Sequence, residues 1–164
     1  MKSRGFTLIE VIAAVAIVGI GIGAAFSLVQ RTLSFGGHTA SQLTASYLAQ
    51  EGVELVRNIR DSNFLELHNG FGGSWDDGLT SCSTGCEGSY DSDTLAVYQD
   101  RFLRINNEFY SYDIAGAATS FKRKITITPV SATQLDVSVE VSWSERGRGG
   151  SVAAATVLYN WLNP

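Results

Sequence analysis

The sequence predicts an α+β fold in which a long N-terminal helix packs on an antiparallel sheet of four or five strands. Two patterns support this prediction. An apolar run from Phe6 to Val29 is followed by apolar residues at helical spacing as far as Asp61. Residues 94–164 instead alternate apolar and polar side chains, which is typical of half-buried strands. A chain of 164 residues accommodates one membrane-length helix and one domain of ordinary size.

The apolar run is long enough to cross a membrane. Val11 to Val29 is nineteen residues without a charge, and at about 1.5 Å per residue it spans roughly 28 Å, close to a bilayer core. The alternative is a cleaved secretory signal, whose apolar region is about 7–15 residues long and ends in an Ala-x-Ala-like site. Lys2 and Arg4 before the run favour a cytoplasmic N-terminus and an extracytoplasmic remainder.

A specific motif stands directly before this run. Lys-Ser-Arg-Gly-Phe-Thr-Leu-Ile-Glu, residues 2–10, resembles the processing site of type IV pilins and type II secretion pseudopilins. The resemblance implies that a prepilin peptidase cuts after Gly5, so that residues 1–5 are a leader, and that Phe6 becomes the N-methylated first residue. Glycine suits the position before the cut, because a residue without a side chain lets a protease approach the backbone closely.

Glu10 is the single charge in the apolar stretch. An acidic residue at the middle of a membrane helix costs roughly 2.5–3.5 kcal/mol, and less near the end. The resemblance implies that Glu10 of an incoming subunit pairs with the Phe6 amino group of its neighbour. Such pairing would select the stagger between subunits, since a buried charge without a partner is costly. The alternative is a glutamate that only reaches the membrane interface.

Three glycines, Gly19, Gly21 and Gly23, interrupt the apolar run. Each costs about 0.8–1.0 kcal/mol of helix propensity relative to alanine. We expect them to loosen the helix of residues 6–30 when it leaves the bilayer for a filament. The alternative is a lipid-facing helix that tolerates glycine, as membrane helices often do.

Residues 31–61 are predicted to form the amphipathic half of the same helix, with Gly36 and Gly37 as a candidate break or bend. Leu43 and Tyr47 lie on a small apolar face that could touch neighbouring subunits. The larger face is expected to cover the sheet and contains Ala45, Leu48, Gly52, Leu55, Val56 and Ile59.

Residues 62–93 are predicted to form a variable loop, which contains both cysteines, Cys82 and Cys86. Outside the cytoplasm we expect a disulfide between them, because this spacing can meet the Cα separation of roughly 4.4–6.8 Å that the bond requires. Zinc is not expected, since two cysteines do not make a four-ligand site. Calcium could bind at Asp76-Asp77 or at residues 91–93, but the EF-hand pattern is absent and a solvated acidic loop is favoured.

Residues 94–164 are predicted to form the antiparallel sheet. Asn106-Asn107 is expected to turn a hairpin between Thr94–Ile105 and Glu108–Tyr112. The alternation predicts further strands over 121–128, 135–144 and 152–161, with residues 145–150 connecting the last two.

Two further stretches resemble PilV-like minor pilins, and the first of them also resembles I-type minor pseudopilins. One is residues 49–62, in which Glu54 and Arg57 are expected to form an ordinary surface pair. The other is in the sheet, where Phe-x-Arg-x-Ile-x-Ile-Thr-Pro-Val begins at Phe121 and Val-x-Trp-x-Glu-Arg-Gly begins at Val141. The loop of residues 62–93 has no such match.

Charge and motifs exclude several function classes. The formal charge is −4, and the loss of Lys2 and Arg4 with the leader leaves −6, which argues against nucleic acid as the main partner. The sequence has no nucleophile elbow, no phosphate-binding glycine loop and no His-Glu-x-x-His motif. His38 and His68 lie far in sequence from any nucleophile–base pair. Neither catalysis nor a cofactor or metal is therefore predicted.

The resemblance thus predicts a minor pilin or pseudopilin that is anchored by one cytoplasmic-membrane helix before it assembles into a type IV pilus or a type II secretion-like filament. Its implied partners are a prepilin peptidase, other pilin or pseudopilin subunits and an inner-membrane assembly platform. An adhesin or DNA-uptake subunit is the alternative. A membrane-anchored enzyme would instead need a catalytic constellation in the head.

Overall fold

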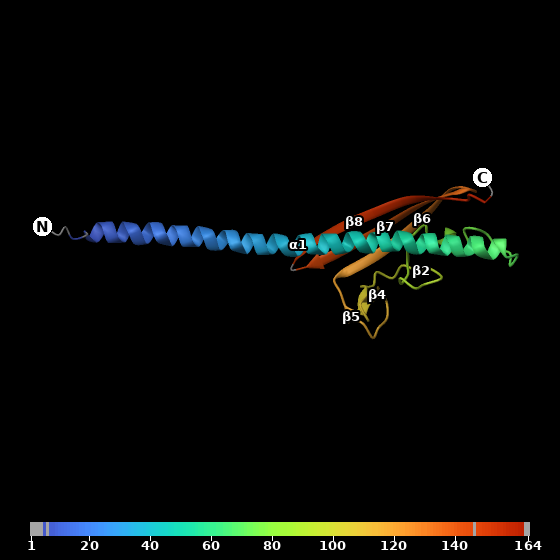
Figure 1. Ribbon diagram of the computed structural model, residues 1–164, viewed down its shortest axis with the longest axis horizontal. Coiled ribbons are helices and arrows are strands. Elements are labelled where there is room, and N and C mark those ends of the chain that lie inside the picture. Colours follow the sequence, from blue (N-terminus) through green and yellow to red (C-terminus); the bar gives the residue numbers. More distant parts are fainter. Residues whose placement is uncertain (1–4, 6, 146, 163–164) are drawn as a thin grey trace. The chain divides into compact units, whose positions relative to one another are not determined.

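The computed structural model describes residues 5, 7–145 and 147–162, and the chain divides into two compact units, Met1–Ala40 and Ser41–Pro164. The first contains the N-terminal part of helix α1, and the second, called the head below, contains the rest (Figure 1). In chain order the elements are α1 (Leu8–His68), the 3-10 helix η1 (Thr80–Cys82), β1 (Cys86–Glu87), β2 (Ala96–Val97), β3 (Arg104–Asn106), β4 (Phe109–Ser111), β5 (Ala117–Ala118), β6 (Phe121–Ser131), β7 (Gln134–Glu145) and β8 (Arg148–Tyr159).

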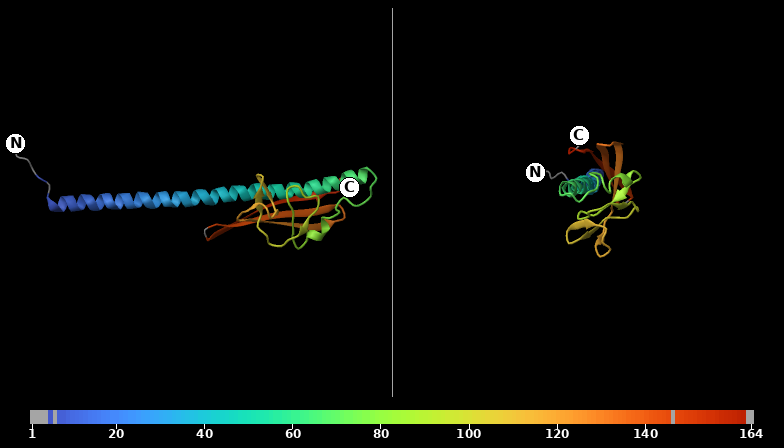
Figure 2. Two further views of the ribbon diagram at one scale, coloured as in Figure 1. Left: turned by 90° about the horizontal axis from the view of Figure 1, so that it is seen from below. Right: turned by 90° about the vertical axis from the view of Figure 1, so that its right-hand side faces the viewer.

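The head confirms the predicted α+β fold. Its main sheet is antiparallel and has five strands in the order β2-β1-β6-β7-β8, and a second sheet has three strands in the order β4-β3-β5. Within the head, α1 lies along one face of the long strands β6 to β8 (Figure 1 and Figure 2). Strand β7 alternates buried and exposed residues along its whole length, as the sequence predicts for a strand with one face on a core.

The predicted sheet-facing side of α1 is buried, and all six residues proposed for it lie in the core. Gly52 explains how closely the helix approaches the sheet. A Cβ atom at Gly52 would lie 2.7 Å from Cγ1 of the buried Val139, so only a residue without a side chain fits there. The proposed second face is open, with Leu43 and Tyr47 both exposed.

Helix α1 ends at His68, later than the sequence predicts. Phe64 continues the apolar stripe and is buried, with its ring centroid 6.2 Å from that of Trp75 and 4.6 Å from that of Trp161. A Schellman motif ends the helix, with Gly70 at a φ of +78°. The N–H of Gly70 donates to the carbonyl of Leu67, and the N–H of Phe71 donates to the carbonyl of Glu66. Helix α1 continues through Gly36 and Gly37, so the predicted break at that pair is wrong, and a bend there stays a prediction.

The predicted loop of residues 62–93 is only partly irregular. Its C-terminal part forms β1, which pairs with both β2 and β6 and therefore lies inside the main sheet. The side chains of Cys86 and Glu87 in β1 are buried. The sequence pattern missed this strand because two residues are too short for any periodicity.

The predicted hairpin exists, but its turn is one residue further along the chain. Asn106 pairs with Phe109, and the two residues between them, Asn107 and Glu108, have φ of 48° and 71°. A type I′ turn requires positive φ at both central residues. Asn106 is instead the last residue of β3, and its amide donates to Asp113 at 2.6 Å.

Two further strand boundaries were wrong. Residues 94–105 do not form one strand, because only Ala96–Val97 and Arg104–Asn106 are paired. The last strand is Arg148–Tyr159 rather than 152–161, since Glu145 pairs directly with Arg148 and Gly147, with φ +78, stands in the tight connection.

Candidate functional site

The N-terminal motif begins with an open backbone. Gly5 is exposed, and a Cβ placed on it would meet no atom within 4 Å. Thr7 precedes the first helical residue, Leu8. The predicted N-methylation site, Phe6, lies outside the described residues. The bond proposed for cleavage, between Gly5 and Phe6, therefore adjoins a glycine that this chain leaves accessible.

Glu10 and Thr7 form a capping box at the start of α1. The backbone N–H of Thr7 donates to Oε2 of Glu10 at 3.4 Å, and the backbone N–H of Glu10 donates to Oγ1 of Thr7 at the same distance. Each side chain thus satisfies a backbone donor that the first turn of a helix leaves without an intrahelical partner. Sequence reasoning missed this local role, although the Thr-x-x-Glu spacing just before an apolar run is the ordinary signature of a capping box.

The apolar part of α1 presents side chains on all sides. From Leu8 to Arg31 every residue is exposed within this chain. Leu8–His68 is one helix that is long and apolar enough to cross a membrane, with a mean hydropathy of 2.5 over its most apolar 18-residue window. A helix that is apolar all round needs an apolar environment, which a bilayer or neighbouring helices supply.

Gly19, Gly21 and Gly23 lie within regular helix, and a Cβ at any of them would meet nothing within 4 Å. No packing contact within the described residues therefore requires glycine at these positions. Loosening of the helix stays a prediction, and so does the alternative that the glycines face lipid.

Arg123 in β6 is the charged residue that sequence reasoning missed. It stands on the inward-facing side of the strand and is fully buried. Its guanidinium donates to Oε1 of Glu51 at 2.7 Å, to the carbonyl of Leu48 at 3.2 Å and to that of Gly88 at 2.7 Å. Arg123 thereby ties α1 to β6 and to the segment after β1. The signal was present, since an arginine interrupts the inward positions of an otherwise regular alternation.

A second buried charge lies in β1. Glu87 accepts hydrogen bonds from Arg101 and from the backbone N–H of Gln99, at 3.2 Å for the latter. The guanidinium of Arg101 also lies over the ring of Tyr112, 4.8 Å from its centroid. Burial raises the pKa of the Tyr112 phenol to about 12. Tyr112 is therefore protonated at neutral pH, as its donated hydrogen bond to the carbonyl of Arg123 requires.

Cys82 and Cys86 are joined by a disulfide in the structure, with their Cα atoms 5.2 Å apart. The bond links η1 to β1, and both cysteines are buried. In the acidic stretches of the loop, Asp77 accepts from the backbone N–H of Ser74 at 2.6 Å. Among the described residues, no group of three or more histidine, cysteine, aspartate or glutamate side chains is placed to hold a metal ion.

Comparison with known proteins adds one match. Residues 1–26 match the family model of the prokaryotic N-terminal methylation motif. No curated protein and no solved structure matches the chain. The match covers the predicted leader, the capping box and most of the apolar run, and together with the long helix and antiparallel sheet it supports a type IV pilin-like protein.

Proposed function

We propose that the chain is a minor pilin or pseudopilin, cut after Gly5, N-methylated on Phe6 and assembled into a type IV pilus or a type II secretion-like filament. The observation that carries the proposal is the methylation motif of residues 1–26 on a helix whose residues 8–31 are apolar almost throughout and exposed. Before assembly the helix holds the protein in the cytoplasmic membrane, with the head on the extracytoplasmic side. In the filament, neighbouring subunits replace lipid around it.

The minor role is supported by the resemblance of residues 49–62 to PilV-like minor pilins and I-type pseudopilins, and of the strands from Phe121 and Val141 to PilV-like heads. The protein works through binding alone. Its partners are the prepilin peptidase, other pilin or pseudopilin subunits and the inner-membrane assembly platform.

Glu10 then has two roles that a pair of variants separates. As a capping residue it bonds to a backbone N–H, which glutamine does as well as glutamate. As an assembly residue its negative charge pairs with the Phe6 amino group of a neighbour, which glutamine cannot replace. Glu10→Gln therefore keeps the helix start and removes only the charge, whereas Glu10→Ala removes both.

The experiment compares incorporation of the two variants into filaments in cells that carry the natural assembly machinery. We expect both variants to be inserted and cleaved, and both to enter filaments at least tenfold less than the wild type. Normal incorporation of Glu10→Gln with loss in Glu10→Ala would assign Glu10 to capping alone. Thr7→Ser, which preserves the capping hydroxyl, is the control and should assemble normally.

A further inference from the structure

Strand β8 is an edge strand without the usual protection. Its 12 residues pair with β7 in one unbroken register, and it stands at the end of the strand order β2-β1-β6-β7-β8. In an antiparallel strand about half of the backbone N–H and C=O groups point to one edge and half to the other. Among the described residues, no backbone group pairs with the N–H and C=O groups of β8 that point away from β7.

Edge strands of soluble domains are normally kept from pairing by proline, by charged side chains, by bulges or by short length. Residues 149–159 contain no proline and no charge. The opposite edge strand, β2, has only two residues. The open edge of β8 is therefore long, uncharged and regular, which is the template on which another strand adds.

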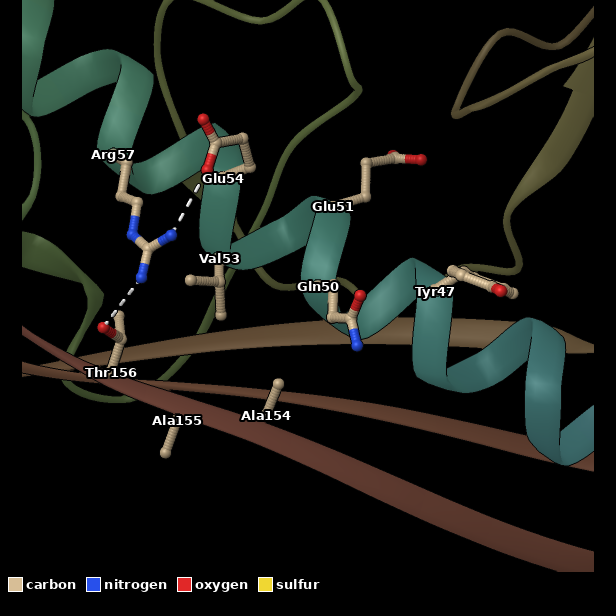
Figure 3. A pocket seen from close by; sticks show the side chains of 9 residues that line it. All are labelled: Tyr47, Gln50, Glu51, Val53, Glu54, Arg57, Ala154, Ala155 and Thr156. Carbon is tan, nitrogen blue, oxygen red and sulfur yellow. Dashed lines mark hydrogen bonds and ion pairs between the residues drawn. The ribbon is translucent and has the colours of Figure 1, made fainter.

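A groove runs beside this edge. Its volume is about 590 Å³, and helix α1 forms one wall while β8 forms the floor (Figure 3). Ala154 and Ala155 point to opposite sides of β8 (Figure 3), and Ala154 is half-buried whereas Ala155 is exposed. From the helix wall, Arg57 donates to Glu54 at 3.4 Å and to the hydroxyl of Thr156 at 3.2 Å. The confirmed surface pair Glu54–Arg57 thus lies at one end of the groove.

We propose that this edge and groove bind an extended segment of a different subunit in the assembled filament, which adds to the main sheet beside β8. The inference rests on the proposed function. The unpaired backbone groups select an extended segment, because a helix satisfies its own N–H and C=O groups and has none to offer along its length. Small side chains at residues 153–155 let the incoming backbone approach, and its alternate side chains enter the groove.

A second copy of this chain does not fit the same role. Its β2 edge is too short, so only β8 could pair with β8. Pairing of β8 with β8 joins the same surface on both copies, which is an isologous contact and needs a two-fold axis between them. Subunits that add one after another to a filament make heterologous, head-to-tail contacts instead, so the occupant is a strand of another subunit.

The test places the photo-crosslinking residue benzoylphenylalanine at Ala155 of the full chain in its native cells. Ser138, the cross-strand neighbour of Ala155 on β7, is the matched control, because both residues are exposed on the same face. We expect at least fivefold more adduct from Ala155, and mass spectrometry should map the adduct to an extended segment of another pilin-like subunit. An adduct with a second copy of the chain, or with a helical segment, would overturn the inference.

Proline variants distinguish strand addition from mere proximity. Adjacent residues of a strand point their N–H groups to opposite edges, so one of Ala154→Pro and Ala155→Pro removes a bond to β7 and the other an outward N–H. The variant with the smaller fall in melting temperature is the one that removes the outward N–H. With benzoylphenylalanine at Val157, this variant should give at least fivefold less adduct than the chain without the proline. If both variants unfold, Ala153→Lys, a charge on the edge, takes their place. An unchanged adduct would overturn strand addition.

The outcome is separable from the proposed function. Filament entry that depends on the charge of Glu10, with no adduct at Ala155, would overturn the strand-addition inference and leave the subunit role intact. Failure to enter any filament would overturn the proposed function itself.

Discussion

Replacement of Arg123 by methionine tests what holds the head together. Methionine has a similar length and fills most of the space, so the cavity term is small. The carbonyl of Gly88 loses a buried donor, which costs about 1–3 kcal/mol. The carbonyl of Leu48 keeps the helical bond that its position in α1 provides, and the side chain of Glu51 is 35% exposed and regains water, so these two losses together add about 1 kcal/mol.

Methionine also removes a cost, since Nε of Arg123 is buried without a hydrogen-bond partner. We therefore expect the free energy of unfolding to fall by about 2–3 kcal/mol, which for a head of this size lowers the melting temperature by roughly 8–12 °C. The assay is thermal unfolding of the full chain in detergent, followed by near-ultraviolet circular dichroism of the buried Trp75 and Trp143. Glu54→Gln, which removes a charge from the exposed pair with Arg57, is the control and should lower the melting temperature by less than about 4 °C.

The refuting result is an Arg123→Met variant as stable as the wild type. Buried ion pairs are sometimes replaced by apolar residues without loss. In that event the contacts of Arg123 would not stabilise the head, and the packing of α1 on β6 and β7 would suffice alone.

Two further predictions concern the loops of the head. Replacing both Cys82 and Cys86 by serine should lower the free energy of unfolding by about 2 kcal/mol, because the disulfide closes a short loop, and denaturant unfolding with and without reductant measures this loss. The backbone N–H of Ala115 and the amide of Asn106 hold the pKa of Asp113 below its usual value. The stabilisation is therefore present above a pH of about 3.9, the ordinary pKa, and is lost as the pH falls through the lower folded-state pKa. Exchange of the Ala115 amide should speed up in that acid range in the wild type but show no such step in Asp113→Asn.

The sequence carried most of the information on α1 and on the long strands. Helical spacing placed Ala45, Leu48 and Val56 on the buried side of α1, and strict alternation in β7 matched its burial residue by residue. Both succeed because one periodic pattern is repeated over many residues. The methylation motif could be recognised for a different reason, since it is a contiguous segment that matches a family model directly.

The short elements could not be predicted. Strand β1 has two residues and owes its place to pairing with β2 and β6, which are distant in sequence. Arg123 was missed because its partners, Glu51 and the Gly88 carbonyl, come from two other segments of the fold. The edge of β8 likewise became visible only with the strand order.

The central claim is that this chain is processed as a prepilin, and one measurement tests it most directly. The full chain is co-expressed with a prepilin peptidase, and the N-terminus of the product is determined by sequencing and mass spectrometry. The account predicts a chain that begins at N-methylated Phe6, and no such product from a Gly5→Val control, whose side chain blocks the approach to the backbone. An intact Met1, or a cut anywhere other than after Gly5, would contradict it.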